Sequence, residues 1–252
     1  MYTKKTFGLI GYPLGHSFSQ QYFTEKFLTL GLKGWEYKTF EIENLDLLPS
    51  VLENNPNLAG FNVTSPYKED IFSHLDEVDS IAKEIHSVNC VKVANQKLVG
   101  FNTDWTGFKQ SLENQVNISS IQKAIILGSG GAAKAVGYAL SCLGIEFKYI
   151  SRQKNNNSKL FLSYEELNAL DFDSFELIVN ATPCGMFSRP EIAAIDTEKI
   201  TGQHTVFDLI YNPPQTPLLH QSLKQGARII NGLEMLHLQA EYSWKIWRES
   251  YE

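Results

Sequence analysis

One short segment constrains the fold of this chain more than any other, the glycine-rich run at residues 128–133. Its sequence Gly-Ser-Gly-Gly-Ala-Ala follows the apolar run at residues 124–127 and precedes a stretch of small residues. This order predicts a strand, a tight turn and a helix. Gly128 allows the turn, Gly130 lets the backbone approach a pyrophosphate, and Ala133 lets the helix pack closely on the strand. The run therefore favours a Rossmann-type dinucleotide site, although a strand–helix turn without a ligand has the same pattern.

The end of the next expected strand, residues 147–150, bears on which dinucleotide would bind. An NAD site usually has Asp or Glu about 20 residues after the glycine run, where the carboxylate accepts from the ribose 2′-hydroxyl. This chain has Ser151, Arg152, Gln153 and Lys154 there, with two cations and no acid. Arginine can hold a 2′-phosphate through two hydrogen bonds, whereas a carboxylate would repel it. We therefore predict NADP rather than NAD, the alternative being that both cations are ordinary surface charges.

Strands that alternate with helices along the chain predict an α/β protein with a substantially parallel sheet. The runs that we assign to strands are short and apolar, and glycine, proline or polar residues end them. They span residues 6–10, 37–42, 58–63, 88–93, 97–101, 124–127, 147–150, 177–180 and 205–209. The runs at 88–93 and 97–101 are close enough to pair as a hairpin.

Capping residues and apolar periodicity place the helices. Ser19 would cap a helix that ends near Leu30, and Ser65 would cap another with Pro66 as its first residue. Further helices are expected over residues 45–53, from the glycine run to residue 143, and over 233–247. A helix that begins after Asp104 leads into the second series of strands, so we place a domain boundary there.

Two polar segments that follow expected strands carry candidate acid–base groups. Lys68 would lie in the first turn of the helix after Ser65, where a cation opposes the helix dipole at a cost of about 0.3–1 kcal/mol. A lysine in such a place is a candidate acid or base, and the alternative is a solvated surface lysine. Asp104 would either cap the next helix or pair with Lys68. A carboxylate raises the pKa of a neighbouring lysine, whereas burial and a helix N-terminus lower it.

Two hydroxyls, those of Ser17 and Ser19, lie just past the first expected strand. Either could donate a hydrogen bond to a carboxylate ligand. The alternative for Ser19 is a role as a helix cap only. The neighbouring His16 is assigned no catalytic role.

Charge and cysteine content narrow the class of partner. The net charge is −6, so a basic face for nucleic acid is not expected. The three cysteines, Cys90, Cys142 and Cys184, form no CxxC pair, which disfavours a disulfide framework or a zinc site and favours a reducing cytoplasm. No apolar run reaches the ~18 residues of a membrane span. Gly11 and Pro13 break the first apolar stretch, which therefore predicts a strand and not a signal peptide.

Seven segments resemble the signatures of shikimate dehydrogenases, and together they span nearly the whole chain. In order, they lie at residues 11–19 (Gly-Tyr-Pro-Leu-Gly-His-Ser-Phe-Ser), 62–68 (Asn-Val-Thr-Ser-Pro-Tyr-Lys), 102–104 (Asn-Thr-Asp), 128–132 (Gly-Ser-Gly-Gly-Ala), 180–186 (Asn-Ala-Thr-Pro-Cys-Gly-Met), 208–219 (Asp-Leu-Ile-Tyr-Asn-Pro-Pro-Gln-Thr-Pro-Leu-Leu) and 231–239 (Asn-Gly-Leu-Glu-Met to Gln). Each is moderately specific by itself, and chance does not account for seven in one order.

The resemblance implies a reversible, NADPH-dependent reduction of 3-dehydroshikimate to shikimate, on the route to chorismate and the aromatic amino acids. It implies an N-terminal α/β substrate-binding domain with a mixed, mainly parallel sheet, over residues 1–104 plus 233–252. A C-terminal Rossmann domain over residues 105–232 would bind NADP, with a cleft between the two domains. The enzyme would be a cytoplasmic monomer or homodimer that acts on a small molecule, with no metal, nucleic acid or membrane partner.

The resemblance also implies roles for individual residues. Lys68 and Asp104 would form the catalytic pair, in which the lysine stabilises and protonates the developing oxyanion and the carboxylate orients the hydroxyl and the lysine. Further residues are expected at the substrate, namely Ser17, Ser19, Thr64, Asn89, Tyr211 and Gln239. Those expected at the cofactor are Gly128, Ser129, Gly130, Gly131, Ala132, Ser151, Arg152, Lys154, Thr182, Met186, Gly232 and Met235.

The chain departs from the family pattern at a few positions. Gln20 stands where the family usually has proline, which affects only the packing of the first helix, as does Phe23-Thr24 in place of His-Asn. Ser-Arg-Gln at residues 151–153 replaces Asn-Arg-Thr, so the arginine is kept while two phosphate partners change. Cys184 replaces a common serine and has no partner cysteine for redox chemistry.

Two other functions fit parts of the pattern. A quinate/shikimate dehydrogenase of broader range would use NAD, and the lack of an acid near Ser151 disfavours it. A non-catalytic Rossmann sensor would bind a dinucleotide and a partner protein. Such a sensor could lose Lys68 or Asp104, and the presence of both disfavours it.

Overall fold

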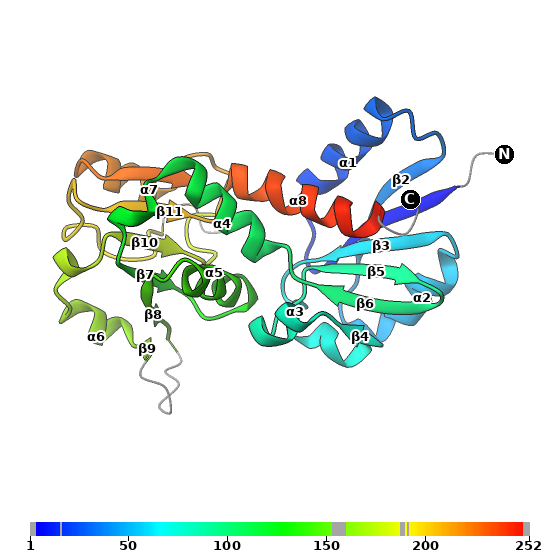
Figure 1. Cartoon of the computed structure of the whole chain (residues 1–252), viewed down its shortest axis with the longest axis horizontal. Helices are drawn as coiled ribbons and strands as arrows, with labels where there is room; N and C mark the ends of the chain where they lie inside the picture. Colours follow the sequence, from blue (N-terminus) through cyan, green and yellow to red (C-terminus); the bar gives the residue numbers. More distant parts are fainter. Residues whose placement is uncertain (1–3, 16, 153–159, 187–189, 191, 249–252) are drawn as a thin grey trace. The chain divides into compact units, whose positions relative to one another are not determined.

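The structure of the chain is a computed structural model that describes residues 4–15, 17–152, 160–186, 190 and 192–248 (Figure 1). The chain forms two compact units. The first unit runs to Thr103 and resumes at Ala240, and the second is Asp104–Gln239. Each unit contains a six-stranded sheet. Among the described residues, no helix is both long enough and apolar enough to span a membrane.

The sheet of the first unit is mixed. Its strands are β1 (Lys5–Gly11), β2 (Trp35–Glu41), β3 (Leu58–Val63), β4 (Glu77–Val78), β5 (Cys90–Ala94) and β6 (Lys97–Phe101), in the order β2-β1-β3-β5-β6-β4. β1 pairs in parallel with β2 and β3, whereas β5 pairs antiparallel with β3 and β6. Asn95 and Gln96 in the β5–β6 turn have φ of +52° and +62°, as a two-residue hairpin turn requires. The predicted hairpin is confirmed.

An aromatic cluster packs helix α1 (Phe18–Thr29) and the C-terminal part of α8 (Leu233–Arg248) on this sheet. Trp247 of α8 is fully buried, and its ring centroid lies 4.9 Å from that of Phe7 on β1 and 5.3 Å from that of Phe23 on α1. The indole N–H donates to the carbonyl of Val91 on β5 at 3.0 Å. Large rings bury much apolar area while the indole N–H keeps a partner, so Trp247 fixes the end of α8 on the sheet.

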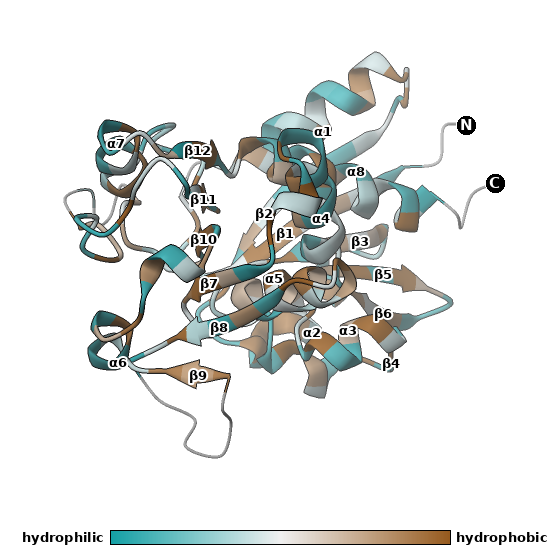
Figure 2. Cartoon of the chain, turned by 60° about the vertical axis from the view of Figure 1, so that its left-hand side comes forward, coloured by the Kyte–Doolittle hydropathy of each residue, from teal (hydrophilic) through white to brown (hydrophobic). Residues whose placement is uncertain are grey.

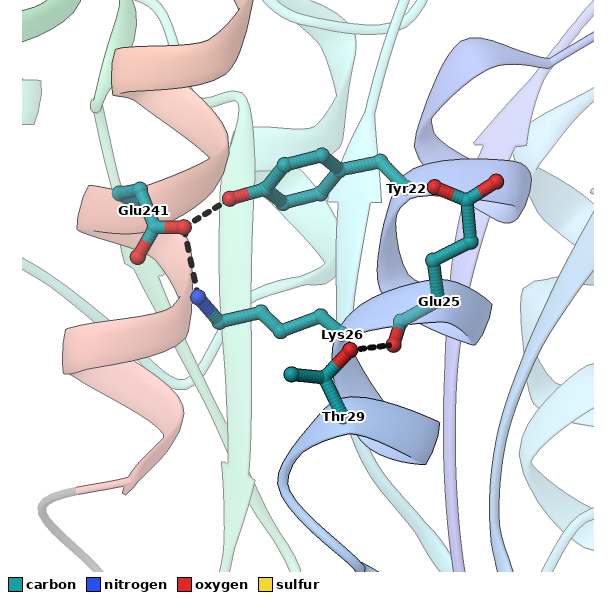
Figure 3. A network of polar contacts seen from close by, with 5 residues as sticks. All are labelled: Tyr22, Glu25, Lys26, Thr29 and Glu241. Atoms are coloured by element: carbon teal, nitrogen blue, oxygen red, sulfur yellow. Dashed lines mark hydrogen bonds and ion pairs between the residues drawn. The ribbon is translucent and has the colours of Figure 1, made fainter.

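α1 and α8 also meet through charged side chains (Figure 3). The Glu241 carboxylate on α8 accepts from the hydroxyl of Tyr22 and from the Nζ of Lys26, the latter at 2.6 Å. The same Nζ lies 5.7 Å from the centre of the Tyr22 ring and 5.9 Å from that of Trp244. Aromatic faces favour a cation at this distance. These contacts join the side chains of α1 to those of the C-terminal part of α8.

The remaining helical segments of the first unit pack through a second apolar cluster that includes Ile10, Leu48, Phe61 and Ile71. They are α2 (Leu48–Asn54), α3 (Ser80–Ile85) and the 3-10 helices Leu45–Leu47 and Asp70–His74. β3 is buried along its whole length, as expected for a strand at the centre of a sheet that is covered on both faces.

The predicted cap of α1 is wrong by two residues. Ser17, and not Ser19, is the N-cap, because the Ser17 hydroxyl accepts from the backbone N–H of Gln20 at 3.2 Å. Ser19 therefore lies inside the first turn, where its side chain is buried.

The helix predicted to begin after Ser65 does not form. Residues 65–69 make turns that lead into the 3-10 helix Asp70–His74, and the Ser65–Pro66 peptide bond is cis. The carbonyl of Lys68 accepts from the N–H of Val88 at 2.8 Å, in place of the N–H four residues further on that an α-helix would use. Lys68 is consequently not in the first turn of an α-helix, and the prediction that a helix dipole opposes its charge is wrong.

The sheet of the second unit is parallel throughout. Its strands are β7 (Lys123–Leu127), β8 (Glu146–Ile150), β9 (Phe161–Leu162), β10 (Leu177–Asn180), β11 (Thr205–Asp208) and β12 (Arg228–Asn231), in the order β12-β11-β10-β7-β8-β9. The apolar central strand β7 is largely brown in Figure 2. The order reverses direction between β7 and β10, as in Rossmann folds. The prediction of an α/β chain with a mixed sheet and a Rossmann-type sheet is confirmed.

The helices of the second unit are α4 (Asp104–Gln115), α5 (Gly131–Cys142), α6 (Tyr164–Asn168), α7 (Pro217–Lys224) and the first part of α8, with 3-10 helices at Ile118–Ser120 and Phe172–Ser174. α5 packs closely on β8, because a Cβ at Gly137 would lie 2.8 Å from the Cζ of Tyr149. α6 begins with a capping box in which Ser163 and Glu166 satisfy each other's backbone N–H groups.

Candidate functional site

Several candidate site residues of the first unit follow strand ends at one edge of its sheet. β1 and β3 are parallel, and β5 runs antiparallel to β3. Backbone bonds confirm the shared edge: the N–H of Thr64 donates to Ile10, and the N–H of Val63 donates to Asn89, each at 2.9 Å. The loop of Ser17 leaves β1, that of Thr64 leaves β3, and Asn89 precedes β5. The fold therefore gathers residues that are up to about 70 positions apart in the sequence, as the edge of an α/β sheet does.

Close backbone packing joins the loop after β1 to the loop after β3. A Cβ at Gly11 would meet the Thr64 side chain, and it would lie 2.8 Å from the Cδ2 of Leu14 and 3.1 Å from the carbonyl oxygen of Ser65. The N–H of Tyr12 donates to that same Ser65 carbonyl at 3.2 Å. Glycine at position 11 thus permits the contact between the segments that carry the candidate hydroxyls and Lys68.

A buried network surrounds Asn89. Its Oδ1 accepts from the backbone N–H of Thr103 at 2.6 Å, and its Nδ2 donates to the Thr103 hydroxyl at 3.0 Å. The Thr103 hydroxyl lies 3.1 Å from that of Ser243, which accepts from the Nδ2 of Asn62 at 3.0 Å. Satisfied buried networks are rigid. This one fixes the segment directly before Asp104, which is the first residue of α4 and is buried.

The network continues to Ser19 through Tyr37. The Tyr37 hydroxyl donates to the Oδ1 of Asn62 at 2.9 Å, and Ser19 makes a side-chain hydrogen bond with Tyr37. Burial raises the pKa of Tyr37 well above its usual value, and the hydrogen bond from Ser19 opposes that rise. Tyr37, Asn62, Thr103 and Ser243 were not predicted as site residues. The sequence could have pointed to Asn62, because a polar residue within an otherwise apolar strand that is buried along its length needs a hydrogen-bond partner.

Lys68 lies in the turn after β3 with its side chain half-buried. Its carbonyl bond to Val88 holds the backbone beside the start of β5, one residue before Asn89. The lysine is thus on the same sheet edge as Thr64 and Asn89. A cation held there can donate to an oxygen at this edge and stabilise negative charge on it.

In the second unit the glycine run joins β7 to α5 with the geometry that its sequence predicts. Gly128 has φ of +107°, and its N–H donates to the carbonyl of Ile150 at 2.8 Å. A Cβ at Gly128 would lie 3.1 Å from the carbonyl oxygen of Ala181, so the turn is pressed against the loop after β10. A Cβ at Gly130 would meet nothing within 4 Å, and this residue caps α5 without a side-chain hydrogen bond. The helix N-terminus can therefore receive an anion, with Gly131 and Ala132 in its first turn.

The end of β8 lies beside this turn. The hydroxyls of Ser129 and Ser151 are 3.0 Å apart, which links the glycine run to the residue before Arg152. Arg152 is exposed, and its charge opposes the rise that burial causes in the pKa of Tyr164. Lys154, the other predicted cation, lies outside the described residues. Two hydroxyls and a guanidinium are suitable donors for a phosphate.

The loops after β10 and β11 share a network that the sequence did not reveal. The Oδ1 of Asn180 accepts from the N–H of Thr182 at 3.0 Å and from its hydroxyl at 2.7 Å. The Nδ2 of Asn180 donates to the Oδ1 of Asp208 at 3.0 Å, and the hydroxyl of Thr216 donates to the Oδ2 at 2.6 Å. The signal available was an acid at the end of the apolar strand β11, where parallel sheets place functional residues.

The other residues predicted at the cofactor and the substrate lie on or near these loops and on α8. Met186 is 44% exposed, and Tyr211 is half-buried, which raises the pKa of its hydroxyl. A Cβ at Gly232 would strike the backbone of Leu209, so only glycine fits where β12 leads into α8. Met235 and Gln239 on α8 are buried, and the Nε2 of Gln239 donates to the carbonyl of Leu236 at 3.0 Å.

No group of three or more His, Cys, Asp or Glu side chains among the described residues could hold a metal ion.

Comparison with known proteins identifies the family. A family model described as the shikimate dehydrogenase substrate binding domain matches residues 9–91. The shikimate dehydrogenase (NADP(+)) of Methanococcus maripaludis strain C6 is 37% identical, over 96% of this chain and 91% of that protein. The crystal structure of shikimate dehydrogenase 1 from Peptoclostridium difficile is 35% identical with a TM-score of 0.87, covering 97% of this chain and 92% of that one. The shikimate 5-dehydrogenase of Thermus thermophilus, whose crystal structure contains NADP(H) and shikimate, is 30% identical in sequence to this chain. Its structure matches with a TM-score of 0.86, over 97% of this chain and 94% of that one. This chain belongs to the shikimate dehydrogenase family.

Proposed function

We propose that this protein is an NADP-dependent shikimate dehydrogenase, which reversibly reduces the ring ketone of 3-dehydroshikimate to the alcohol of shikimate. The observation that carries the proposal is the 37% identity, over nearly the full length of both chains, with a relative of that name. The polar sheet edge of the first unit and the glycine run of the second supply the two kinds of site that the reaction needs. By the same reasoning, the reaction would serve the synthesis of chorismate and the aromatic amino acids.

The residues around the glycine run fit NADP. The N-terminus of α5 has open space at Gly130 and would receive the pyrophosphate. Ser129, Ser151 and Arg152 would donate to the 2′-phosphate, with Lys154 as a further cation. Thr182, Met186, Gly232 and Met235 would contact the nicotinamide half. When bound, NADPH supplies the hydride that reduces the ketone carbon.

Lys68 and Asp104 would act on the substrate oxygen. During reduction negative charge develops on the carbonyl oxygen, and the Lys68 ammonium would stabilise that charge and donate a proton to the oxygen. Asp104 would accept a hydrogen bond from a substrate hydroxyl and orient the ammonium. The bonds from Asn89 to Thr103 support this role, because they hold the backbone that leads into Asp104.

Hydroxyl and amide groups would bind the rest of the substrate. Ser17 and Ser19 would donate to the carboxylate. Thr64, Asn89, Tyr211 and Gln239 would bond the ring hydroxyls. We also propose that residues 1–104 plus 233–252 serve the substrate and residues 105–232 the cofactor.

The test is turnover followed at the NADPH absorbance band, with shikimate and either NADP or NAD. We expect rapid reduction of NADP, and we expect Lys68→Ala to lower kcat by roughly 10²–10⁴-fold while NADP still binds. Arg152→Ala should raise the KM for NADP about tenfold and leave the KM for shikimate unchanged. The controls Lys83→Ala and Arg228→Ala remove exposed cations from the same two units. Failure of the unaltered protein to turn over with either cofactor would contradict the proposed function.

A further inference from the structure

Asp208 is a buried acid that the proposed mechanism does not use. It ends β11, and its side chain is fully buried. Its Oδ1 accepts from the backbone N–H of Ile210 and from the Nδ2 of Asn180, both at 3.0 Å. Its Oδ2 accepts from the Thr216 hydroxyl at 2.6 Å. The carboxylate thus bonds to three points, on the loop that follows β11, on the end of β10 and at the start of α7.

The bonds extend from these points into the neighbouring loops. Asn180 holds Thr182 through its Oδ1, and its Nδ2 also donates to the carbonyl of Cys184 at 3.2 Å. Thr216 caps α7, because its hydroxyl accepts from the N–H of Leu219 at 3.3 Å. Asp208 therefore sets the course of the segments at residues 181–186 and 209–216.

Burying the charge of Asp208 costs stability, so folding alone does not explain an acid at this position. Burial raises the pKa of Asp208 to about 6, against the opposing effect of its three hydrogen bonds. The three donors are a hydroxyl, an amide and a peptide N–H, and none of them is a cation that would compensate for the loss of water around the charge. An ionised acceptor does, however, make shorter and stronger hydrogen bonds than a neutral one. The charge thus fixes the loops more tightly than a neutral side chain would.

The two segments lie where the second half of a dinucleotide would bind. In a parallel sheet of this order the ligand crosses the carboxyl ends of the strands at the reversal between β7 and β10. The glycine run and Arg152 lie on the side of β7 and β8, which leaves the ends of β10 and β11 for the nicotinamide half. Thr182, Met186 and Tyr211 belong to the two segments that Asp208 holds.

We propose that Asp208 is a positioning residue for the cofactor, whose carboxylate holds the segments at residues 181–186 and 209–216 in the conformation that receives the nicotinamide half of NADP. The inference rests on the proposed function. Asp208 would not touch the reacting atoms. It acts through Asn180 and Thr216, which connect it to the residues that would contact the ring.

The experiment compares Asp208→Asn, Thr216→Val and Thr216→Ser with the unaltered protein, and uses Asp173→Asn as a control for removing an exposed charge from the same unit. NADPH affinity is measured by its fluorescence, and amide hydrogen exchange of the two segments is measured without any ligand. We expect Asp208→Asn and Thr216→Val to raise the Kd for NADPH about tenfold and to speed exchange in both segments. Thr216→Ser, which keeps the hydroxyl, should behave as the unaltered protein does. The denaturation midpoint at pH 7 should not worsen in Asp208→Asn.

Unchanged amide exchange in Asp208→Asn would overturn the inference, as would a fall in stability that accompanies and explains weaker binding. The exchange measurement needs neither cofactor nor substrate. If the unaltered protein fails to turn over, the proposed function fails, and the exchange data still decide whether Asp208 holds the two segments.

Discussion

The buried carboxyl of Asp208 should make the free energy of unfolding fall as the pH rises from about 4 to about 6. Its pKa is raised from 3.8 to about 6 in the folded protein. The folded state therefore binds this proton more tightly than the unfolded chain does. Below the unfolded pKa both states are protonated and burial costs nothing through ionisation. Above the folded pKa the protein must hold a buried charge, and the full cost is present.

The size of the effect follows from the two pKa values. They differ by about two units, and each unit corresponds to about 1.36 kcal/mol, so Asp208 lowers stability at pH 7 by about 3 kcal/mol. Asp208→Asn removes the ionisation, but its amide replaces the acceptor of the Thr216 hydroxyl, which costs about 1 kcal/mol. The variant should thus be about 2 kcal/mol more stable at pH 7. At pH 4, where the unfolded chain is already more than half ionised at this residue, it should be about 0.5 kcal/mol less stable.

Urea denaturation of both proteins between pH 4 and pH 8 tests this reversal. The difference between the two curves cancels the titration of every group that the substitution leaves alone. Asp173→Asn, at an exposed position, should give a difference that does not change sign. The reasoning is refuted if Asp208→Asn and the unaltered protein keep the same difference at every pH, because burial would then have no effect on the proton affinity of Asp208.

Two further predictions concern the packing of the first unit. Gly60→Ala should lower the free energy of unfolding, measured by urea denaturation, by about 1–3 kcal/mol or more, because the new Cβ would strike the buried indole of Trp247. The control Gly15→Ala should have little effect, because nothing lies within 4 Å of its Cβ. Equal losses in both variants would contradict this prediction. Glu241→Gln should cost about 1 kcal/mol at low salt by removing the ion pair with Lys26, and the loss should shrink in 1 M salt; a loss that does not depend on salt would show that the charge is not what matters.

Much of the second unit follows from local sequence. Gly128 has a positive φ, which favours glycine, and Gly130 is the N-cap of α5 and makes no side-chain hydrogen bond there. Apolar runs that are bounded by polar residues predicted the ends of β7, β8, β10 and β11 to within about one residue. The reason is that a buried parallel strand must be apolar along its length. The motif order was enough to predict the family and the cofactor before any contact was known.

The two wrong predictions in the first unit, the cap of α1 and the helix after Ser65, fall where tertiary contacts compete with local capping preferences. Ser17 and Ser19 are both good caps, and Ser19 makes a bond with Tyr37, which is distant in the sequence. Ser65 and Pro66 also look like a helix start, but the carbonyl of Lys68 bonds to the strand segment at Val88 instead.

Local sequence specifies the alternation of strands and helices and the glycine turn, because both depend on backbone preference and on the pattern of apolar residues. It also shows which residues could carry the chemistry. Which polar groups form hydrogen bonds with one another depends on the tertiary contacts. The side chains of Asn89 and Thr103, of Asn62 and Ser243, and of Asp208 and Thr216 are hydrogen-bonded pairs that the fold brings together from different elements and loops. A buried donor or acceptor must be satisfied by whatever the fold places beside it, and no local pattern records which residue that will be.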